Sequence, residues 1–193
     1  MIPLLLGVLD SAKLGHLDAH VLLQSQTVGA GGAASITFSS IPQGYRALEL
    51  RGLIRGAGTD ATNGDHVVVN FNGDSTSGNY TEYHMLQGNG SAAASSAAVG
   101  GSRSWLAINM ANSTSMANVF GCFSSVILDY TSTSKNKVLR SLCGSDANGW
   151  GFADVVSSSW HPATPAAIVS MTISMYLGVN LAQFSRVDLY GIV

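Results

Sequence analysis

Apolar and polar residues alternate in short runs along most of the chain. Leu48 and Leu50 are each followed by a charged residue, and residues 168–175 alternate over their whole length. Successive side chains of a strand point to opposite faces, so a period of two predicts half-buried β-strands. We expect strands at residues 21–28, 34–38, 47–55, 66–71, 80–86, 105–110, 119–130, 137–143, 151–158, 167–176 and 186–192.

Glycine-rich and polar segments separate the predicted strands. Asn72-Gly73 is the dipeptide that tight hairpin turns prefer, because both positions tolerate positive φ. Residues 88–101 are mainly Ser, Ala and Gly, which predicts a long surface loop. No long amphipathic helix is expected, so parallel α/β folds are disfavoured. About ten or eleven short strands therefore predict an all-β fold, an antiparallel β-sandwich of the jelly-roll type over residues 19–193.

Residues 1–18 differ from the rest of the chain. The first charge is Asp10, so the positive charge that precedes the apolar part of a signal peptide is missing. The apolar run is also too short to cross a bilayer, and we expect no membrane insertion. We expect an extended N-terminal segment, either laid on its own domain or anchored in a partner. Its anchoring residues would be Ile2, Leu4, Leu5, Leu6, Val8 and Leu9.

The chain carries little charge. Charged residues make up 10 % of the sequence, against about 25 % in typical globular domains, and the net charge is −2. Because no basic run occurs, binding to nucleic acid has no electrostatic basis. Hydrophobic residues at 46 % are enough for a folded core, so the surface must consist largely of Ser, Thr, Asn, Gln and Gly.

The two cysteines, Cys122 and Cys143, lie in different predicted strands. A disulfide would require these strands to be neighbours with suitable geometry. Two buried free thiols are the favoured interpretation, because cysteine packs as a small hydrophobic residue and a cytoplasm keeps thiols reduced.

No catalytic motif occurs in the sequence. The five histidines have no zinc-binding spacing, and nucleophile-elbow, P-loop and dinucleotide-binding patterns are absent. We therefore assign no catalytic residue, metal or cofactor, and expect a protein that is not an enzyme. One alternative is that Glu49 and Glu82 form a glycosidase pair across distant strands. Asp60, Asp65 and Asp74 could also ligate calcium with nearby asparagines, although turn formation explains them more simply.

Aromatic residues near the ends of strands are the best candidates for contact with carbohydrate. Their ring faces can stack on sugars, although core packing is the simpler explanation for most of them. Trp150 and Trp160 are flanked by Gly, Ser and Pro, so we expect these two to be exposed and to bind a ligand. The others considered are Tyr80, Tyr83 and Trp105.

Several short motifs follow one another in a defined order. They are residues 27–42, Asn70–Asp74 with Asn79-Tyr80, residues 86–91, Leu128–Tyr130 with Asn136-Lys137, Ser158–Trp160 and Leu189–Ile192. In this order, from about Val28 to Val193, the chain resembles bacteriophage virion proteins of the jelly-roll type. The resemblance implies a particle component, often a homotrimer, in tail fibres, baseplate appendages or head decorations. It carries over no catalytic residue.

These observations predict a non-enzymatic virion structural protein that is assembled in the host cytoplasm. We expect a tail-fibre or baseplate-appendage module that is attached to other virion proteins through residues 1–18. Its exposed β-sandwich would serve host attachment, with a host-surface glycan as ligand. Trimer formation would cover apolar faces and strand edges that a lone sandwich exposes. A capsid decoration or cement protein is the alternative, and a glycan-degrading enzyme is less favoured.

Overall fold

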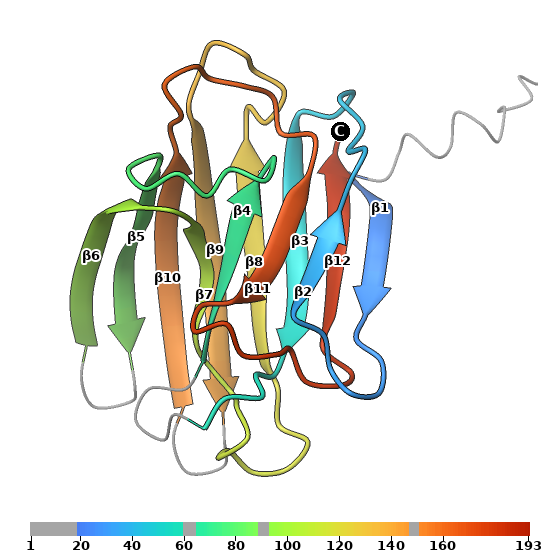
Figure 1. The fold of residues 1–193 in the computed structure, drawn as a ribbon, viewed down its shortest axis with the longest axis vertical. Helices are drawn as coiled ribbons and strands as arrows, with labels where there is room; N and C mark the ends of the chain where they lie inside the picture. The colour runs from blue at the N-terminus through green and yellow to red at the C-terminus, as the bar shows by residue number, and fades with distance from the viewer. Residues whose placement is uncertain (1–18, 60–64, 89–92, 147–150) are drawn as a thin grey trace, which may run out of the picture.

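The computed structural model describes residues 19–59, 65–88, 93–146 and 151–193, which form β-strands without any helix (Figure 1). Two antiparallel sheets, with eight and four strands, pack face to face, so the predicted all-β sandwich is confirmed. No helix able to cross a membrane occurs in these ranges. The strands are β1 (His20–Thr27), β2 (Ser35–Phe38), β3 (Ala47–Ile54), β4 (Asp65–Phe71), β5 (Tyr80–Gly88), β6 (Ala93–Gly101), β7 (Ser104–Met110), β8 (Gly121–Leu128), β9 (Lys137–Asp146), β10 (Gly151–Trp160), β11 (Met171–Met175) and β12 (Arg186–Ile192).

Eight of the strands have the connectivity of a jelly roll. The smaller sheet has the order β2-β11-β4-β7, and the first half of the larger sheet has the order β1-β12-β3-β8. Counted among these eight alone, the larger sheet contains the first, eighth, third and sixth strands. The smaller sheet contains the second, seventh, fourth and fifth. This nesting of early and late strands is the double Greek key that defines a jelly roll.

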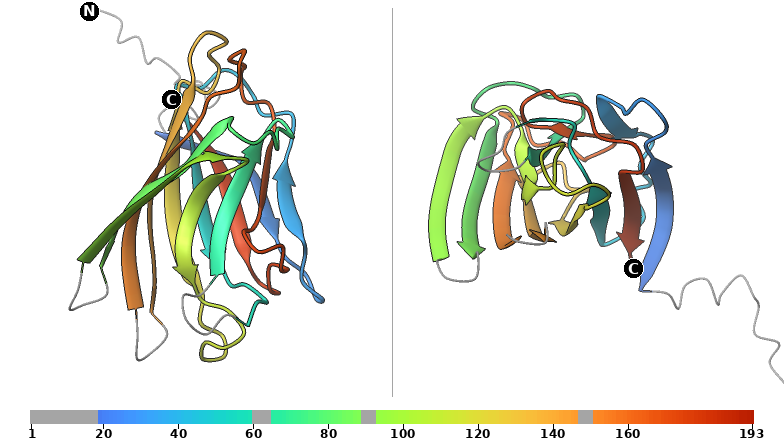
Figure 2. Two further views of the ribbon diagram at one scale, coloured as in Figure 1. Left: turned by 60° about the vertical axis from the view of Figure 1, so that its left-hand side comes forward. Right: turned by 90° about the horizontal axis from the view of Figure 1, so that it is seen from below.

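The remaining four strands are two inserted pairs that widen the larger sheet. β9 and β10 follow β8, and β5 and β6 follow β10, which gives the order β8-β9-β10-β5-β6. The smaller sheet has no counterpart to this extension. β5 and β6 consequently lie at one side of the molecule, past the edge of the smaller sheet (Figures 1 and 2).

The core follows the alternation seen in the sequence. Leu48 and Leu50 on β3 are fully buried, and Ile36 and Phe38 on β2 of the smaller sheet belong to the same buried cluster. Each such side chain contributes about 1.5–3 kcal/mol by leaving water. The sandwich is therefore stabilised by the period-two pattern that predicted its strands.

The predicted loop at residues 88–101 is wrong, because Ala93–Gly101 forms β6. This strand pairs with β5 from Gly88↔Ala93 to Tyr80↔Gly101, and most of its residues are exposed. Its Ser, Ala and Gly side chains bury little, so the pairing rests on backbone hydrogen bonds to a strand that the rest of the sheet already holds. Composition alone carries no signal for such a strand.

The Asn72-Gly73 turn forms without making a hairpin. Both residues have positive φ, 53° and 71°, as the dipeptide predicts. β4 nevertheless pairs with β11 and β7, whereas β5 pairs with β10 and β6. The turn therefore starts a crossing between the two sheets, because both neighbours of β4 come from distant parts of the sequence.

The two cysteines lie on neighbouring strands but remain free thiols. Cys143 on β9 pairs with Phe123 on β8, one position from Cys122. Because adjacent residues of a strand point to opposite faces, Cys143 is buried in the core while Cys122 is exposed on the outer face. The expectation of two free thiols agrees with the structure, but burial of Cys122 was wrong.

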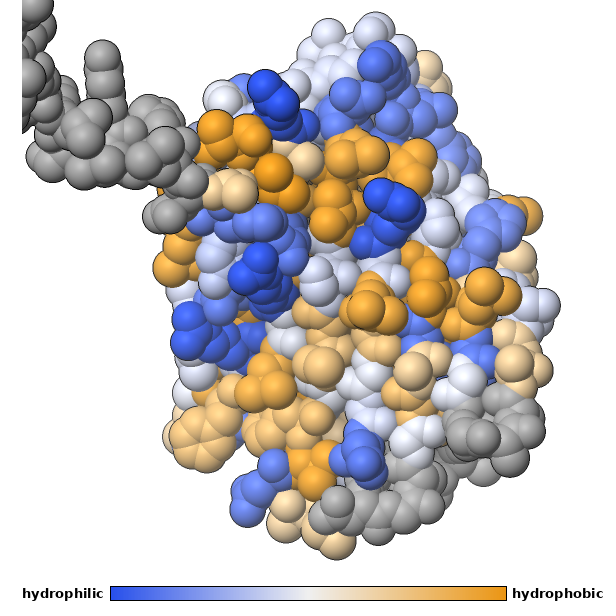
Figure 3. Space-filling view, turned by 180° about the vertical axis from the view of Figure 1, so that it is seen from behind, coloured by the Kyte–Doolittle hydropathy of each residue, from blue (hydrophilic) through white to orange (hydrophobic). Residues whose placement is uncertain are grey.

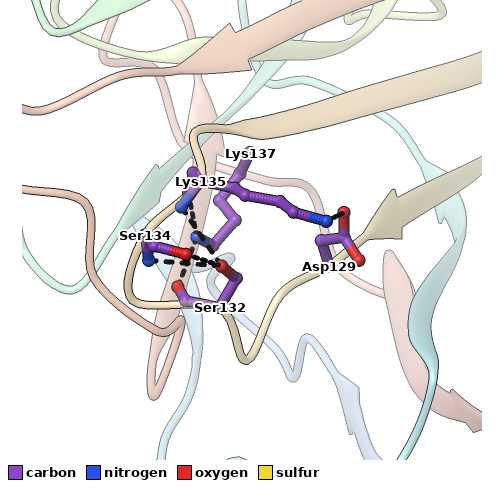
Figure 4. Close-up of polar contacts among 5 residues, drawn as sticks. All are labelled: Asp129, Ser132, Ser134, Lys135 and Lys137. Atoms are coloured by element: carbon purple, nitrogen blue, oxygen red, sulfur yellow. Dashed lines mark hydrogen bonds and ion pairs between the residues drawn. The ribbon is translucent and has the colours of Figure 1, made fainter.

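A buried lysine closes the loop between β8 and β9 (Figure 4). Lys137 is 1 % exposed, and its Nζ donates hydrogen bonds to the carbonyl oxygens of Ser132 at 2.7 Å and Lys135 at 2.5 Å. Burial lowers the pKa of Lys137 below its usual range. Lys135 instead forms an exposed ion pair with Asp129 at 3.1 Å. Lys137 therefore holds the backbone of this loop, whereas Lys135 pairs with a side chain at the surface.

Candidate functional site

A pocket of about 240 Å³ lies between the sheets beside β7, the edge strand of the smaller sheet. β4 and β7 supply residues from the smaller sheet, and β5 and β10 supply residues from the extension of the larger sheet. Because β10 and β5 continue past β7, their inner surface is only partly covered at this edge. The lining residues are His66, Tyr83, Met85, Gln87, Trp105, Ile108, Asn109 and Phe152.

The indole of Trp105 is the centre of an aromatic cluster at the pocket. Its ring centroid lies 4.4 Å from that of Tyr83, 4.7 Å from that of His66 and 4.9 Å from that of Tyr176. The Arg103 guanidinium lies 5.3 Å from the Tyr176 ring. Trp105 is 8 % exposed, yet its indole N–H has no acceptor among the described residues. Buried indole N–H groups usually find a partner, so this donor requires an explanation.

A buried carboxylate lies next to the pocket. Asp154 is on the same face of β10 as Phe152, pairs with Gln87 of β5, and is 1 % exposed. Neither carboxylate oxygen has a partner of normal hydrogen-bond geometry among the described residues. Burial raises the pKa of Asp154 to about 6, and the nearby amides of Asn109 and Gln87 offset part of that effect. The two amides thus connect the carboxylate with the pocket that they line.

These groups suit a small polyhydroxylated ring. Aromatic faces pack against the C–H face of a sugar, while amide groups both donate and accept hydrogen bonds at its hydroxyls. The indole N–H of Trp105 and the carboxylate of Asp154 are buried beside the pocket, so a ligand would reach either group only if lining side chains moved. A volume of about 240 Å³ is below the roughly 300–1,000 Å³ of drug-sized sites, so the pocket suits a single ring.

The glutamate pair considered from the sequence does not converge. Glu49 lies on β3 and Glu82 on β5, and four strand spacings separate these strands in the sheet order β3-β8-β9-β10-β5. At about 4.8 Å per spacing this is roughly 19 Å, beyond the roughly 5–9.5 Å between glycosidase carboxyls. Glu49 instead accepts hydrogen bonds from Arg51 at 2.9 and 3.0 Å and from Ser124 at 2.7 Å.

Asp74 is fully engaged in a loop contact. Its Oδ2 accepts hydrogen bonds from Trp160 Nε1 at 2.7 Å and Asn79 Nδ2 at 2.9 Å, and its Oδ1 accepts from the backbone N–H of Thr76 at 2.9 Å. Burial opposes ionisation, but these bonds outweigh it and lower the pKa of Asp74 to about 2. Within the described ranges no three His, Cys, Asp or Glu side chains are placed to hold a metal ion.

Trp160 is buried, so the expectation of an exposed indole is wrong. It is 3 % exposed, its ring centroid lies 5.7 Å from that of Phe71, and its N–H is bonded to Asp74. The alternation of β10 explains this, since Val156, Ser158 and Trp160 share its inward face. The polar residues before it were a poor guide, because Ser157 and Ser159 occupy outward positions and Ser158 is a small buried one.

The other predicted site residues lie outside the described ranges. They are the ligand candidate Trp150, the calcium-ligand candidate Asp60 and the anchoring residues Ile2, Leu4, Leu5, Leu6, Val8 and Leu9.

The polar residues of the pocket were missed from the sequence. Asp154 occupies an inward position between Phe152 and Val156, where an alternating strand normally has an apolar side chain. An acidic residue that breaks the apolar half of the alternation is therefore the signal that could have identified it. Gln87 and Asn109 carry no comparable signal, because only the folded chain brings β5 and β7 together.

The fold places this protein in the class of jelly-roll β-sandwiches. A small pocket lined by aromatic and amide side chains lies between its sheets, beside the edge strand β7. Comparison with known proteins goes no further than this class: no protein-family model, curated protein or solved structure matches the chain.

Proposed function

We propose that this protein is a non-enzymatic virion structural module that binds a host-surface glycan in the pocket around Trp105. The observation that carries the proposal is the unpaired indole N–H of Trp105, in a pocket that is lined by amides and adjoins the unpaired carboxylate of Asp154. Each buried polar group without a partner lowers the stability of the fold by about 1–3 kcal/mol. Such groups are found mainly at binding sites, where they can interact with a ligand.

The virion role is supported by the sequence resemblance and is compatible with the jelly-roll order of the strands. In this proposal the chain is a tail-fibre or baseplate-appendage module in a homotrimer, attached to other virion proteins through residues 1–18. The outer face of the larger sheet carries exposed apolar side chains that an assembly would cover, among them Leu86, Leu142 and Val155.

A capsid decoration or cement protein is the second candidate, favoured by the same outer face. Gold-labelled antibody against the protein, imaged on intact particles, separates the two, because a tail-fibre or appendage module labels the tail and a cement protein labels the head. Label on the head, together with failure to bind any glycan, would replace the first proposal with the second.

Binding is tested by titrating the full chain with monosaccharides and purified bacterial surface polysaccharides in a calorimeter. We expect Trp105→Phe and Gln87→Ala each to weaken binding about tenfold, since each removes a hydrogen bond worth about 1–1.5 kcal/mol. Gln183→Ala, at an exposed position outside the pocket, is the matched control and should bind normally. Unchanged affinity in both pocket variants would overturn the proposed site, and shortened polysaccharide after incubation would favour the enzyme.

A further inference from the structure

The outer face of the larger sheet contains a hollow of about 650 Å³, on the opposite side from the pocket. Its floor follows one line of paired residues, from Leu53 through Cys122 and Gly144 to Ala153. Gly144 has no side chain, so the sheet is hollowed between its larger neighbours, and Leu142 borders the hollow from the next line of residues. Figure 3 shows hydrophobic residues gathered over much of this face.

Close to the start of β1 the same face carries charged side chains beside the exposed Leu22 and Leu128. His20 Nε2 lies 2.9 Å from Glu49 Oε2, and Arg51 is bonded to the other oxygen of Glu49 at 2.9 Å. The Arg51 guanidinium also lies 4.6 Å from the Tyr190 ring. Leu128 on β8, which pairs with Ala47 at this end of the sheet, is 49 % exposed, so both charged and apolar side chains lie between the start of the described chain and the hollow (Figure 3).

The segment before Ala19 is more polar next to the domain than at its far end. Going back from Ala19, residues 10–18 include the polar side chains of Asp10, Lys13, His16 and Asp18, and residues 2–9 are almost wholly apolar. Residues 10–18, which mix polar side chains with Leu14 and Leu17, would cross the mixed surface, and the aliphatic residues 2–9 would then reach the hollow.

The distance also fits. Ala19 is fixed next to β12, where the backbone N–H of Val193 donates to its carbonyl oxygen at 3.3 Å. The hollow is centred about three strands away and six residues along β3, roughly 14 Å across and 20 Å along the sheet, or about 25 Å on the diagonal. Ten residue steps from Leu9 to Ala19 span up to about 33 Å. The segment can reach the hollow without being fully extended.

We infer that residues 2–9 occupy the hollow on the outer face of their own domain. This inference is independent of the glycan pocket, which lies between the sheets. It implies that the segment expected to attach the protein to the particle is covered by its own sandwich until a stronger partner displaces it. Intramolecular docking is favoured over docking into a second copy because the short linker keeps the local concentration of the segment high.

Cys122 provides a direct readout, because it lines the hollow and is exposed in the described chain. Cys143 is 4 % exposed, and burial raises its pKa to about 12, so it reacts slowly. The rate of reaction with N-ethylmaleimide at neutral pH therefore measures how accessible the Cys122 thiol is. We expect the full chain with Leu4→Ser, Leu5→Ser and Leu6→Ser to react about tenfold faster than the unmodified chain, because the hollow is then open.

Three controls complete the experiment. Cys122→Ser measures the slow background, and Leu177→Ser changes an exposed leucine outside the hollow and should leave the rate unchanged. Circular dichroism checks that each variant is folded. Equal rates in the unmodified chain and the triple variant overturn the inference. Mixing the triple variant with the Cys122→Ser chain tests docking between copies, and slower labelling in that mixture would assign the hollow to a second copy.

Discussion

Two aspartate–tryptophan regions of this sandwich use the same residue types in opposite ways. In the loop after β4, Asp74 accepts the indole N–H of Trp160 at 2.7 Å, and its pKa is lowered to about 2. Beside the pocket, Asp154 on β10 and Trp105 on β7 have polar atoms without a well-formed hydrogen bond among the described residues, and the pKa of Asp154 is raised to about 6. Both tryptophans are more than nine-tenths buried.

The two regions differ in whether their polar groups are paired, and this difference distinguishes a structural contact from a candidate binding site. In the Asp74 region every polar group is paired, so that region contributes stability. In the Asp154 region the buried carboxylate and the buried indole N–H lower the free energy of unfolding, and the fold keeps both groups beside a pocket. Such uncompensated groups are characteristic of sites where stability is given up for binding.

The largest expected effect is the loss of the Asp74 contacts. Asp74→Ala removes three hydrogen bonds and leaves the Trp160 N–H buried without a partner, so we expect a loss of about 2–4 kcal/mol in the free energy of unfolding. The folded pKa of about 2 lies below the usual 3.8, so this contribution is present above pH 4 and lost as pH falls toward 2. Urea unfolding measures both effects.

Lys135→Ala is the control for this substitution. It removes an ion pair whose side chains are 65 % and 58 % exposed, and exposed pairs contribute about 0–1 kcal/mol. A loss as large as that of Asp74→Ala would mean that pairing with solvent-exposed charges, not burial, sets the stability of these loops.

The second effect has the opposite sign. Asp154→Asn should stabilise the protein by about 1–3 kcal/mol at neutral pH, because it removes a buried charge that the nearby amides compensate only in part. The folded pKa of about 6 lies above the usual 3.8, so the protonated acid is favoured in the folded state and wild-type stability falls as pH rises from about 4 to 6.

Unfolding of the Asp154→Asn variant should lack this fall, and the two proteins should be equally stable below about pH 4. Calorimetric titration of the same variant tests its role in binding. A variant that is less stable than wild type at neutral pH would show that the carboxylate is satisfied, and the contrast with Asp74 would disappear.

The smallest expected difference compares the two tryptophans directly. Trp160→Phe should cost about 1–3 kcal/mol, since it leaves Asp74 without its shortest hydrogen bond. Trp105→Phe should cost less than about 1 kcal/mol, because its N–H has no partner to lose, while glycan binding falls about tenfold. Equal destabilisation by the two substitutions, measured by urea unfolding, would contradict the distinction drawn here.

The strands were largely predictable because their main signal is local. Alternation at Leu48 and Leu50 identified β3 and its buried face, and similar patterns located most of the other strands. β6 was missed because its Ser, Ala and Gly residues have no apolar face. Trp160 was misjudged because its neighbours in sequence are polar, whereas its neighbours in space are Phe71 and Tyr80.

The sequence by itself determined that this chain is an all-β protein. It also determined where most of the strands run and which side chains of β3 face the core. These properties depend on residues that are close together along the chain. Only the tertiary structure decided the jelly-roll order, the added strands β5, β6, β9 and β10, and the opposite behaviour of Asp74 and Asp154. The physical reason is that the pKa of a carboxyl group depends on its burial and its hydrogen-bond partners. For Asp74 the decisive partner is Trp160, 86 positions away in sequence, and for Asp154 the fold provides burial that the amides of Asn109 and Gln87 offset only in part.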